Sequence, residues 1–206
     1  MRLAAAISVA LILIGGCSNS APHTISSIPL GRVIQSIGFP SVLRNSRPYI
    51  LAERSIIYTG DIITTDEQSL LHIQLDSGPT LNLGTRSQLL LINIHEREHA
   101  LSLSKGSMQV DDISNRVNHF EIATTVTAIE TSSGKFWIGY DSDSRGIHVV
   151  SLGTEEINVQ NDDGNTVLTT PFQASSVIAG AAPQDALVWS KSRFENTLKR
   201  YTRTSR

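Results

Sequence analysis

Runs in which apolar and polar residues alternate constrain the fold more strongly than any other feature of this sequence. Clear examples are Leu71–Leu75, Leu81–Leu83, Leu101–Leu103, Phe120–Ile122 and Ile157–Val159. Successive side chains of a β-strand point to opposite faces, so a period of two gives each run one face to bury. The alternation therefore predicts many short, half-buried strands.

Turn-forming residues separate these runs. They are Asp76–Gly78, Lys105–Gly106, Ser132–Gly134, Asp141–Gly146 and Asn161–Gly164. Short strands at fairly regular spacing are typical of sandwiches, barrels and β-solenoids. The recurring unit of strand, glycine turn and strand fits a degenerate solenoid or stacked hairpins. We predict an all-β body over residues 31–180, either a β-solenoid or a stacked-hairpin sandwich.

The residues after this body predict one amphipathic α-helix over residues 183–203. Its apolar stripe would contain Leu187, Phe194, Leu198 and Tyr201. Pro183 suits the first turn of a helix. A helix of this length gains most of its stability by burying its apolar face, so we expect it to dock on the β body up to about Phe194.

Trp189 and Arg193 are four residues apart, so on such a helix they would lie side by side and form a cation–π contact. Two interpretations remain open for this region. Either the side chains pack on the β body, or Trp189, Arg193 and Phe194 bind a partner protein.

The N-terminus has the pattern of a bacterial lipoprotein. Arg2 precedes an apolar run over residues 3–14, which is too short to cross a bilayer as a permanent helix. Ile14–Cys17 resembles a lipobox, in which the peptide is cut before the cysteine and the cysteine is lipidated. We predict a signal peptide over residues 1–16 and a lipidated flexible tether over residues 17–30. An ordinary secreted protein with a free cysteine is the alternative.

The cysteine count and the net charge limit which covalent links and which classes of partner the chain can have. Cys17 is the single cysteine, so no intrachain disulfide can form. The formal net charge of −2 does not favour nucleic acid as a partner. We expect the periplasmic face of the cell envelope as the location. Ser18 favours the outer membrane, because an aspartate at that position is the usual inner-membrane retention signal.

Several motifs, in order along the chain, resemble the FecR domain. They are Gly31–Val33 with Gly38 and Arg44, Gly60–Thr65, Leu71–Leu83 with Asp76 and Gly78, Leu101–Leu103 with Gly106, Phe120–Thr125 with Ala128, Gly134 and Trp137, and a tail of Asp185, Leu187, Trp189 and Arg193. The resemblance extends over residues 31–179. The sequence departs from the family pattern where Ser77 separates Asp76 from Gly78 and where Val126 replaces a proline.

The resemblance implies a role in envelope signalling. The signalling members place a sigma-regulating segment and a membrane helix before this domain. A signal peptide that starts at Met1 leaves no room for either, so we do not expect direct control of a sigma factor. Gly60 and Asp61 are interpreted as turn residues, because glycine adopts positive φ and aspartate bonds nearby backbone amides.

Two segments resemble metal sites. His95–His99 matches the zinc-protease pattern H-E-x-x-H, which needs a helix to bring both histidines onto one face. Its flanks are strand-like, so we predict a hairpin turn instead. Asp141–Gly146 resembles the start of a calcium loop, but Arg145 occupies a ligand position and a polar turn is preferred.

We identify no catalytic residue, no metal ligand and no cofactor. The function that we predict is a non-enzymatic envelope lipoprotein whose β domain is a binding or scaffolding module for another envelope protein. A sensory module in an envelope signalling pathway is the first alternative, and a zinc hydrolase using His95 and His99 is the second. The sequence does not predict the oligomeric state.

The lipobox generates a direct test. The Cys17→Ser substitution removes the only thiol that could carry diacylglycerol, so it should abolish acyl labelling and release the protein from membranes. Metabolic labelling with a clickable fatty acid and membrane fractionation measure both effects. Labelling that persists in the variant would rule out Cys17 as the anchor.

Overall fold

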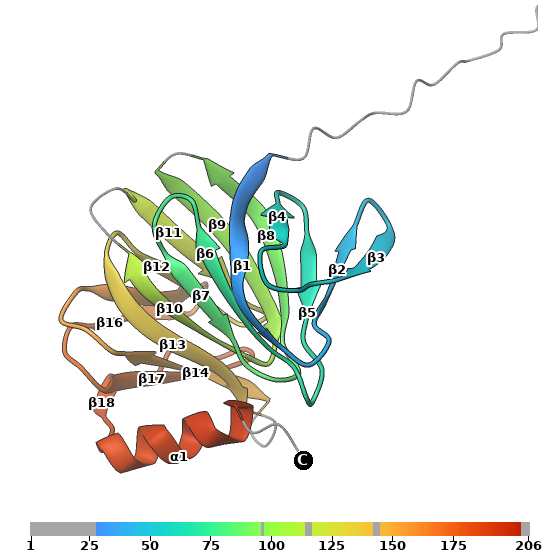
Figure 1. Ribbon diagram of the computed structural model, residues 1–206. Coiled ribbons are helices and arrows are strands. Elements are labelled where there is room, and N and C mark those ends of the chain that lie inside the picture. The colour runs from blue at the N-terminus through green and yellow to red at the C-terminus, as the bar shows by residue number, and fades with distance from the viewer. Residues whose placement is uncertain (1–27, 96, 114–116, 142–144, 203–206) are drawn as a thin grey trace, which may run out of the picture.

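The computed structural model describes residues 28–95, 97–113, 117–141 and 145–202, which form two nine-stranded sheets and one helix (Figure 1). The predicted signal peptide, Cys17 and residues 18–27 of the tether lie outside the described residues. No helix within the described ranges has the length and apolar character that a membrane crossing requires.

Each sheet is continuous from one end of the molecule to the other. The first sheet contains, in spatial order, β18 (Leu187–Val188), β17 (Gln173–Ile178), β14 (Gly146–Ser151), β13 (Gly134–Asp141), β10 (Ser107–Ile113), β7 (Thr80–Leu83), β6 (Leu70–Leu75), β1 (Pro29–Ile37) and β4 (Ile56–Tyr58). The second contains β16 (Gly164–Leu168), β15 (Ile157–Asn161), β12 (Ala128–Thr131), β11 (His119–Ala123), β9 (Glu98–Lys105), β8 (Gln88–His95), β5 (Ile62–Thr64), β2 (Ser41–Arg44) and β3 (Arg47–Ile50).

The chain advances through both sheets in step, adding strands to one and then to the other. For example, β8 and β9 form a hairpin in the second sheet, β10 adds to the first sheet, and β11 returns to pair in parallel with β9. The all-β prediction is confirmed, and of its two forms the structure is a sandwich of stacked hairpins.

One apolar layer fills the space between the sheets. In β6, Leu71, Ile73 and Leu75 are buried and the residues between them are partly exposed, as the alternation predicts. Phe120 and Ile122 of β11 meet this layer from the second sheet. Burying one such side chain contributes about 1.5–3 kcal/mol, so this layer supplies most of the driving force for folding.

The predicted turns fall between strands. Gly78, Gly106, Gly134 and Gly164 all have positive φ, the conformation that glycine adopts at least cost. At Gly106 a Cβ atom would also lie 2.4 Å from Cα of Ser87, so the close approach of the two backbones requires glycine.

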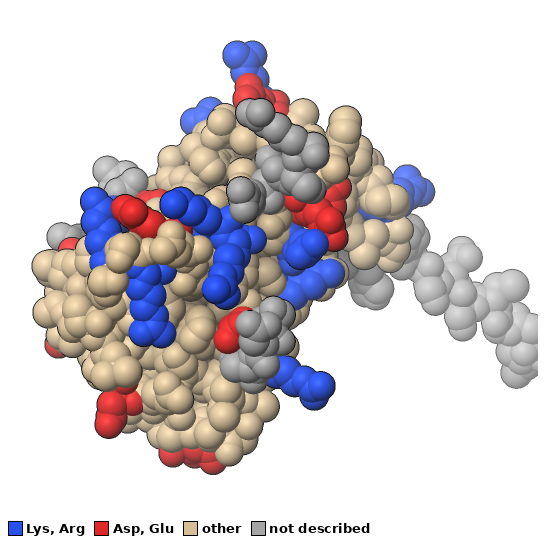
Figure 2. Space-filling view, turned by 90° about the horizontal axis from the view of Figure 1, so that it is seen from below, with Lys and Arg blue, Asp and Glu red and all other residues tan. Residues whose placement is uncertain are grey.

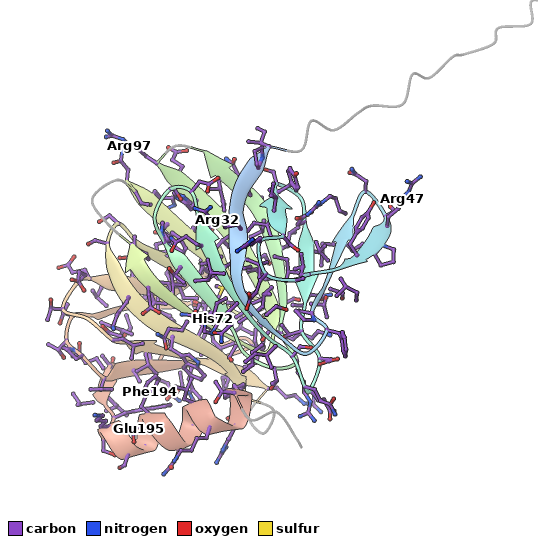
Figure 3. The ribbon with its side chains drawn as sticks, viewed as in Figure 1. Arg32, Arg47, His72, Arg97, Phe194 and Glu195 are labelled. Carbon is purple, nitrogen blue, oxygen red and sulfur yellow. The ribbon has the colours of Figure 1, made fainter. Side chains whose placement is uncertain are left out.

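A second apolar layer lies on the outer face of the first sheet. Trp137 of β13 and Val150 of β14 point away from the sandwich core and are covered by α1 (Lys191–Thr202). Phe194 lies between α1 and the sheet in Figure 3, whereas the neighbouring Glu195 is exposed. The ring centroids of Trp137 and Phe194 are 6.0 Å apart. The prediction that the helix docks on the β body is therefore confirmed, but the limit at about Phe194 was wrong, because Tyr201 also packs against Trp137.

The helix begins later than predicted, at Lys191 instead of residue 183. Leu187 and Val188 pair with β17 as the strand β18, and Leu187 is 61% exposed, so its place in the apolar stripe was wrong. The N-terminus is set by Ser190, whose Oγ accepts a hydrogen bond from the Arg193 amide at 3.2 Å. Such an N-cap satisfies one of the free amides of the first turn.

An ion pair between a partly exposed arginine and a buried aspartate joins the two sheets near β3 and β4, the edge strands at one end of the sandwich. Asp61 is fully buried, and its two oxygens accept hydrogen bonds from Nε and Nη2 of Arg44, each at 2.7 Å. Arg44 belongs to β2 of the second sheet, and its Nη2 also bonds the Ile56 carbonyl of β4 in the first. Asp61 additionally accepts the Tyr58 amide at 2.9 Å, which confirms the turn and adds a structural role for the carboxylate.

This ion pair generates a stability prediction. The Arg44→Leu substitution leaves a buried carboxylate without its cation and should lower the free energy of unfolding by about 3–5 kcal/mol. The matched control is Arg86→Leu, which breaks an ion pair with Glu67 in which both side chains are exposed, and should cost far less. Urea denaturation measures both values, and equal losses would contradict the structural role of Asp61.

Candidate functional site

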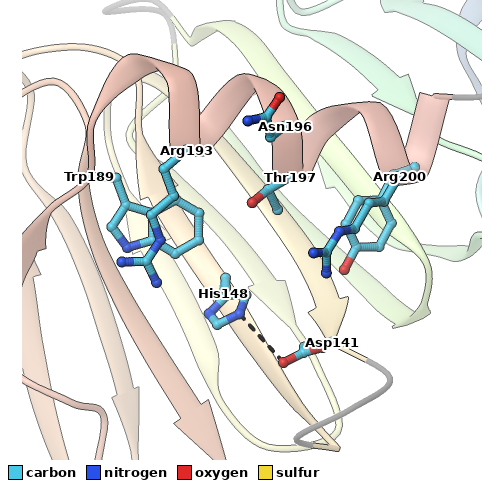
Figure 4. Close-up of a pocket in the computed structure, with 8 residues that line it drawn as sticks. Asp141, His148, Trp189, Arg193, Asn196, Thr197 and Arg200 are labelled. Atoms are coloured by element: carbon cyan, nitrogen blue, oxygen red, sulfur yellow. Dashed lines mark ion pairs between the residues drawn. The ribbon is translucent and has the colours of Figure 1, made fainter.

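A groove of about 320 Å³ lies where α1 crosses the outer face of the first sheet (Figure 4). Its floor contains His148 of β14 and Asp141 at the end of β13. Its rim contains Trp189, Arg193 and Arg200. The volume is at the lower end of the range typical of small-ligand sites.

His148 holds its place in the floor through three contacts. Its Nδ1 lies 2.8 Å from the Ser176 hydroxyl, its Nε2 lies 3.7 Å from an Asp141 oxygen, and its ring meets the Trp189 ring edge-on at 5.2 Å. Burial lowers the pKa of His148; Asp141 opposes this shift, and Arg193 and Arg200 add to it. The neutral imidazole is therefore the favoured form near pH 7.

Arg193 is positioned by an aromatic ring. Its guanidinium carbon lies 4.1 Å above the centroid of Trp189, which is itself only 5% exposed. The predicted cation–π contact is confirmed, although Trp189 precedes the helix instead of belonging to it. Stacking on a buried ring restricts the guanidinium and leaves its N–H groups available at the groove.

The C-terminal half of α1 is tied to the sandwich below the groove. The Tyr201 hydroxyl donates to the Tyr140 carbonyl, and the Tyr201 carbonyl accepts the Thr85 amide at 2.6 Å. The Tyr201 and Trp137 ring centroids are also 5.3 Å apart. These contacts hold Tyr201 in place and thereby position the backbone of Arg200, the residue before it.

A second hollow of about 410 Å³ adjoins the groove and shares Asp141, Arg200 and Tyr201 with it. It adds Arg86 and Arg145 to the lining. Figure 2 views the molecule from the side of α1 and shows lysine and arginine side chains gathered across this face. The two hollows together form an electropositive surface with a single lining carboxylate, Asp141, among the described residues.

The three candidate partner-binding residues do not share one environment. Trp189 and Arg193 line the groove, whereas Phe194 is buried beneath the helix against Trp137 and Phe172. Only Arg193 of the three is exposed. Binding of a partner by this region stays a prediction, and Cys17 lies outside the described residues.

The zinc-protease pattern is not on a helix. The backbones of His95 and Glu98 pair across the β8–β9 hairpin, which confirms the predicted turn. His99 is 1% exposed; it stacks on Phe120, and its Nε2 lies 2.6 Å from the hydroxyl of Ser77, the residue that departs from the FecR pattern. Within the described ranges, no three His, Cys, Asp or Glu residues are grouped so as to hold a metal ion.

The calcium-like segment Asp141–Gly146 connects β13 to β14, as the preferred turn requires, and residues 142–144 lie outside the described residues.

The sequence analysis did not identify His148 and Arg200 as groove residues. Two signals were available: the period of two puts His148 on the opposite face from Ile147 and Val149, and Arg200 is two helical turns after Arg193.

One buried and two partly buried histidines make stability depend on pH. Burial lowers the pKa of His72, His99 and His148 below the usual 6.5, so in moderately acidic solution the unfolded chain binds more protons than the folded one. The free energy of unfolding should have its full value above about pH 6.5 and should decrease as the pH drops below that value.

The His99→Leu substitution should weaken this pH dependence, because it removes one of the three histidines whose pKa burial lowers. Denaturant titrations between pH 5 and 8 measure the slope, and a slope that does not respond to His99→Leu would contradict the assignment.

The comparisons with known proteins agree with the fold. A family model described as FecR protein matches residues 61–154. Two solved structures from Parabacteroides distasonis, each described as an anti-sigma factor, are similar. The first has a TM-score of 0.57 at 11% identity, over 67% of this chain and 64% of that chain; the second has 0.52 at 14% identity, over 68% and 74%.

The chain thus spans less than two thirds of the first structure, and likeness at these identities concerns the fold alone. No curated protein sequence matches this chain. Residues 61–154 include β5 to β14, among them the strands that form the floor of the groove. Residues 61–154 are therefore similar to the FecR family, and this match covers just under half of the chain.

Proposed function

We propose that this protein is a non-enzymatic binding module of the bacterial cell envelope, anchored by a lipid on Cys17, which engages another envelope protein through the groove between α1 and the first sheet. The observation that carries the proposal is the groove itself. A stacked Arg193, a second arginine and a half-buried His148 converge there.

The position of the groove supports this role. β1 begins at the end of the sandwich that lies away from α1 in Figure 1. A tether that enters at Pro29 would therefore leave the groove facing away from the point of attachment. About 12 residues separate Cys17 from Pro29, and fully extended they would reach roughly 40 Å, enough to hold the groove clear of the membrane.

A sensory role is the second candidate, and the FecR domain favours it. A sensor would transmit binding at the groove to a partner, and α1 is the element best placed to do so, because it is held to the sandwich mainly by one apolar cluster and the bonds of Tyr201. Binding alone suffices for a scaffold, whereas a sensor requires a change in α1 on binding.

Photocrosslinking in intact envelopes tests the proposal. A benzophenone amino acid replaces Asn196, an exposed residue that lines the groove, and in a matched variant it replaces Asn165, which is exposed on β16 of the second sheet. We expect a discrete crosslinked protein, identified by mass spectrometry, from position 196 and none from position 165. Crosslinks from position 165 alone would place the binding surface elsewhere, and none from either would contradict the proposed function.

A further inference from the structure

One face of α1 presents a row of hydrogen-bonding side chains to the groove. Arg193, Asn196, Thr197 and Arg200 are spaced i, i+3, i+4 and i+7, which places them along a single side of a helix. Both arginines are donors only, and asparagine and threonine add further N–H and O–H groups. A ligand that lies along this row must therefore be rich in acceptors.

The two arginines define the length of that ligand. Seven residues of an α-helix rise about 10 Å, so the guanidinium groups start from points that far apart. A polypeptide in the extended polyproline II conformation has three residues per turn and advances about 3.1 Å per residue, so side chains three positions apart lie on the same side and about 9 Å apart. Two carboxylates three positions apart on an extended chain would match the two arginines.

Both arginines of the row are available to bind a ligand. Within the described part of the chain, no carboxylate forms an ion pair with Arg193 or Arg200. Asp141, the one lining carboxylate among the described residues, lies beside His148 in the floor and lines both hollows together with Arg200. A guanidinium can bind a carboxylate through two parallel hydrogen bonds, which gives geometric specificity as well as attraction.

The shape of the site distinguishes a peptide from a membrane. Lipid headgroups meet a protein at an exposed, convex or flat surface, whereas these groups line a hollow walled by Trp189. The start of β1, which leads to the predicted lipid anchor, is at the far end of the sandwich. Both observations favour an occupant that enters the groove.

We propose that the groove binds an extended acidic segment of a partner protein, with one carboxylate at Arg193 and a second, three residues along, at Arg200. This inference rests on the proposed function and specifies its ligand. The adjoining hollow extends the electropositive path with Arg145, so a further acidic residue beyond Arg200 would strengthen binding.

Calorimetric titration of the soluble Cys17→Ser protein tests the proposal. The probe is a glycine–serine peptide with blocked ends and two glutamates three positions apart; the control peptides carry glutamines, or adjacent glutamates. Arg193→Gln and Arg200→Gln each remove one contact and should weaken binding roughly tenfold or more. Lys191→Gln and Lys199→Gln remove the same charge from exposed positions of α1 outside the groove and should change affinity little.

The outcomes separate the alternatives. Saturable binding of the spaced peptide, weakened by salt and by the arginine substitutions but not by the lysine substitutions, supports the proposal. Binding to phosphatidylglycerol vesicles that falls equally in all four variants, without peptide binding, identifies a membrane surface and overturns it. Equal binding of the spaced and adjacent peptides overturns the two-point geometry. Binding of inorganic phosphate without binding of the spaced peptide identifies a simple anion site and overturns the proposal.

The melting temperature of each variant shows whether it is folded. If position 196 crosslinks to an envelope protein but the spaced peptide does not bind, the proposed function stands and this inference fails. If neither occurs, both fail.

Discussion

The docking of α1 on the sandwich depends on β13, a strand that has apolar side chains to bury on both faces of its sheet. Phe136, Trp137 and Ile138 are consecutive and all buried, so β13 has apolar side chains on both sides of its sheet. The sandwich core covers Phe136 and Ile138 but cannot cover Trp137, because that ring points outward. A second layer has to shield it, and α1 provides that layer.

The need to cover Trp137 also determines the local sequence. Gly139 lies beneath the ring, and a Cβ atom there would come within 2.1 Å of the indole, so no larger residue fits without moving Trp137. Where α1 crosses the sheet, its apolar side meets Trp137 and its polar side is left beside His148. The groove is thus a consequence of helix docking, and its basic character comes from the residues of α1 that do not face the sheet.

Much of this fold could be predicted from residue patterns, because half-buried strands and glycine turns are local features. The inward residues of β6 and β11 and the positive φ of Gly106 and Gly134 follow directly from alternation and turn chemistry. The start of α1 could not be predicted in the same way. Ser190 is a good N-cap, but the pairing of Leu187 with Ala174, which places Leu187 in β18 and not in the helix, is a long-range contact.

The site was predictable only in part, for the same reason. Trp189 and Arg193 are close in sequence and were identified together, although Phe194 is buried and does not line the groove. His148 and Asp141 come from β13 and β14, and their approach to α1 depends on tertiary structure. The pairing of Arg44 with Asp61 was missed in the same way, since both residues were noted and only the fold brings them together.

The central claim is that α1 is a fixed part of the molecule, docked on the outer face of the first sheet. A free helix of this length is marginal in water, so protection of its amides can come only from docking. Amide hydrogen exchange measures this directly. The account predicts that the amides from Leu198 to Tyr201 exchange far more slowly than in an unstructured peptide, and that substituting Phe194 with alanine accelerates them selectively. Exchange at unprotected rates in the unaltered protein would contradict the docked helix and the groove that depends on it.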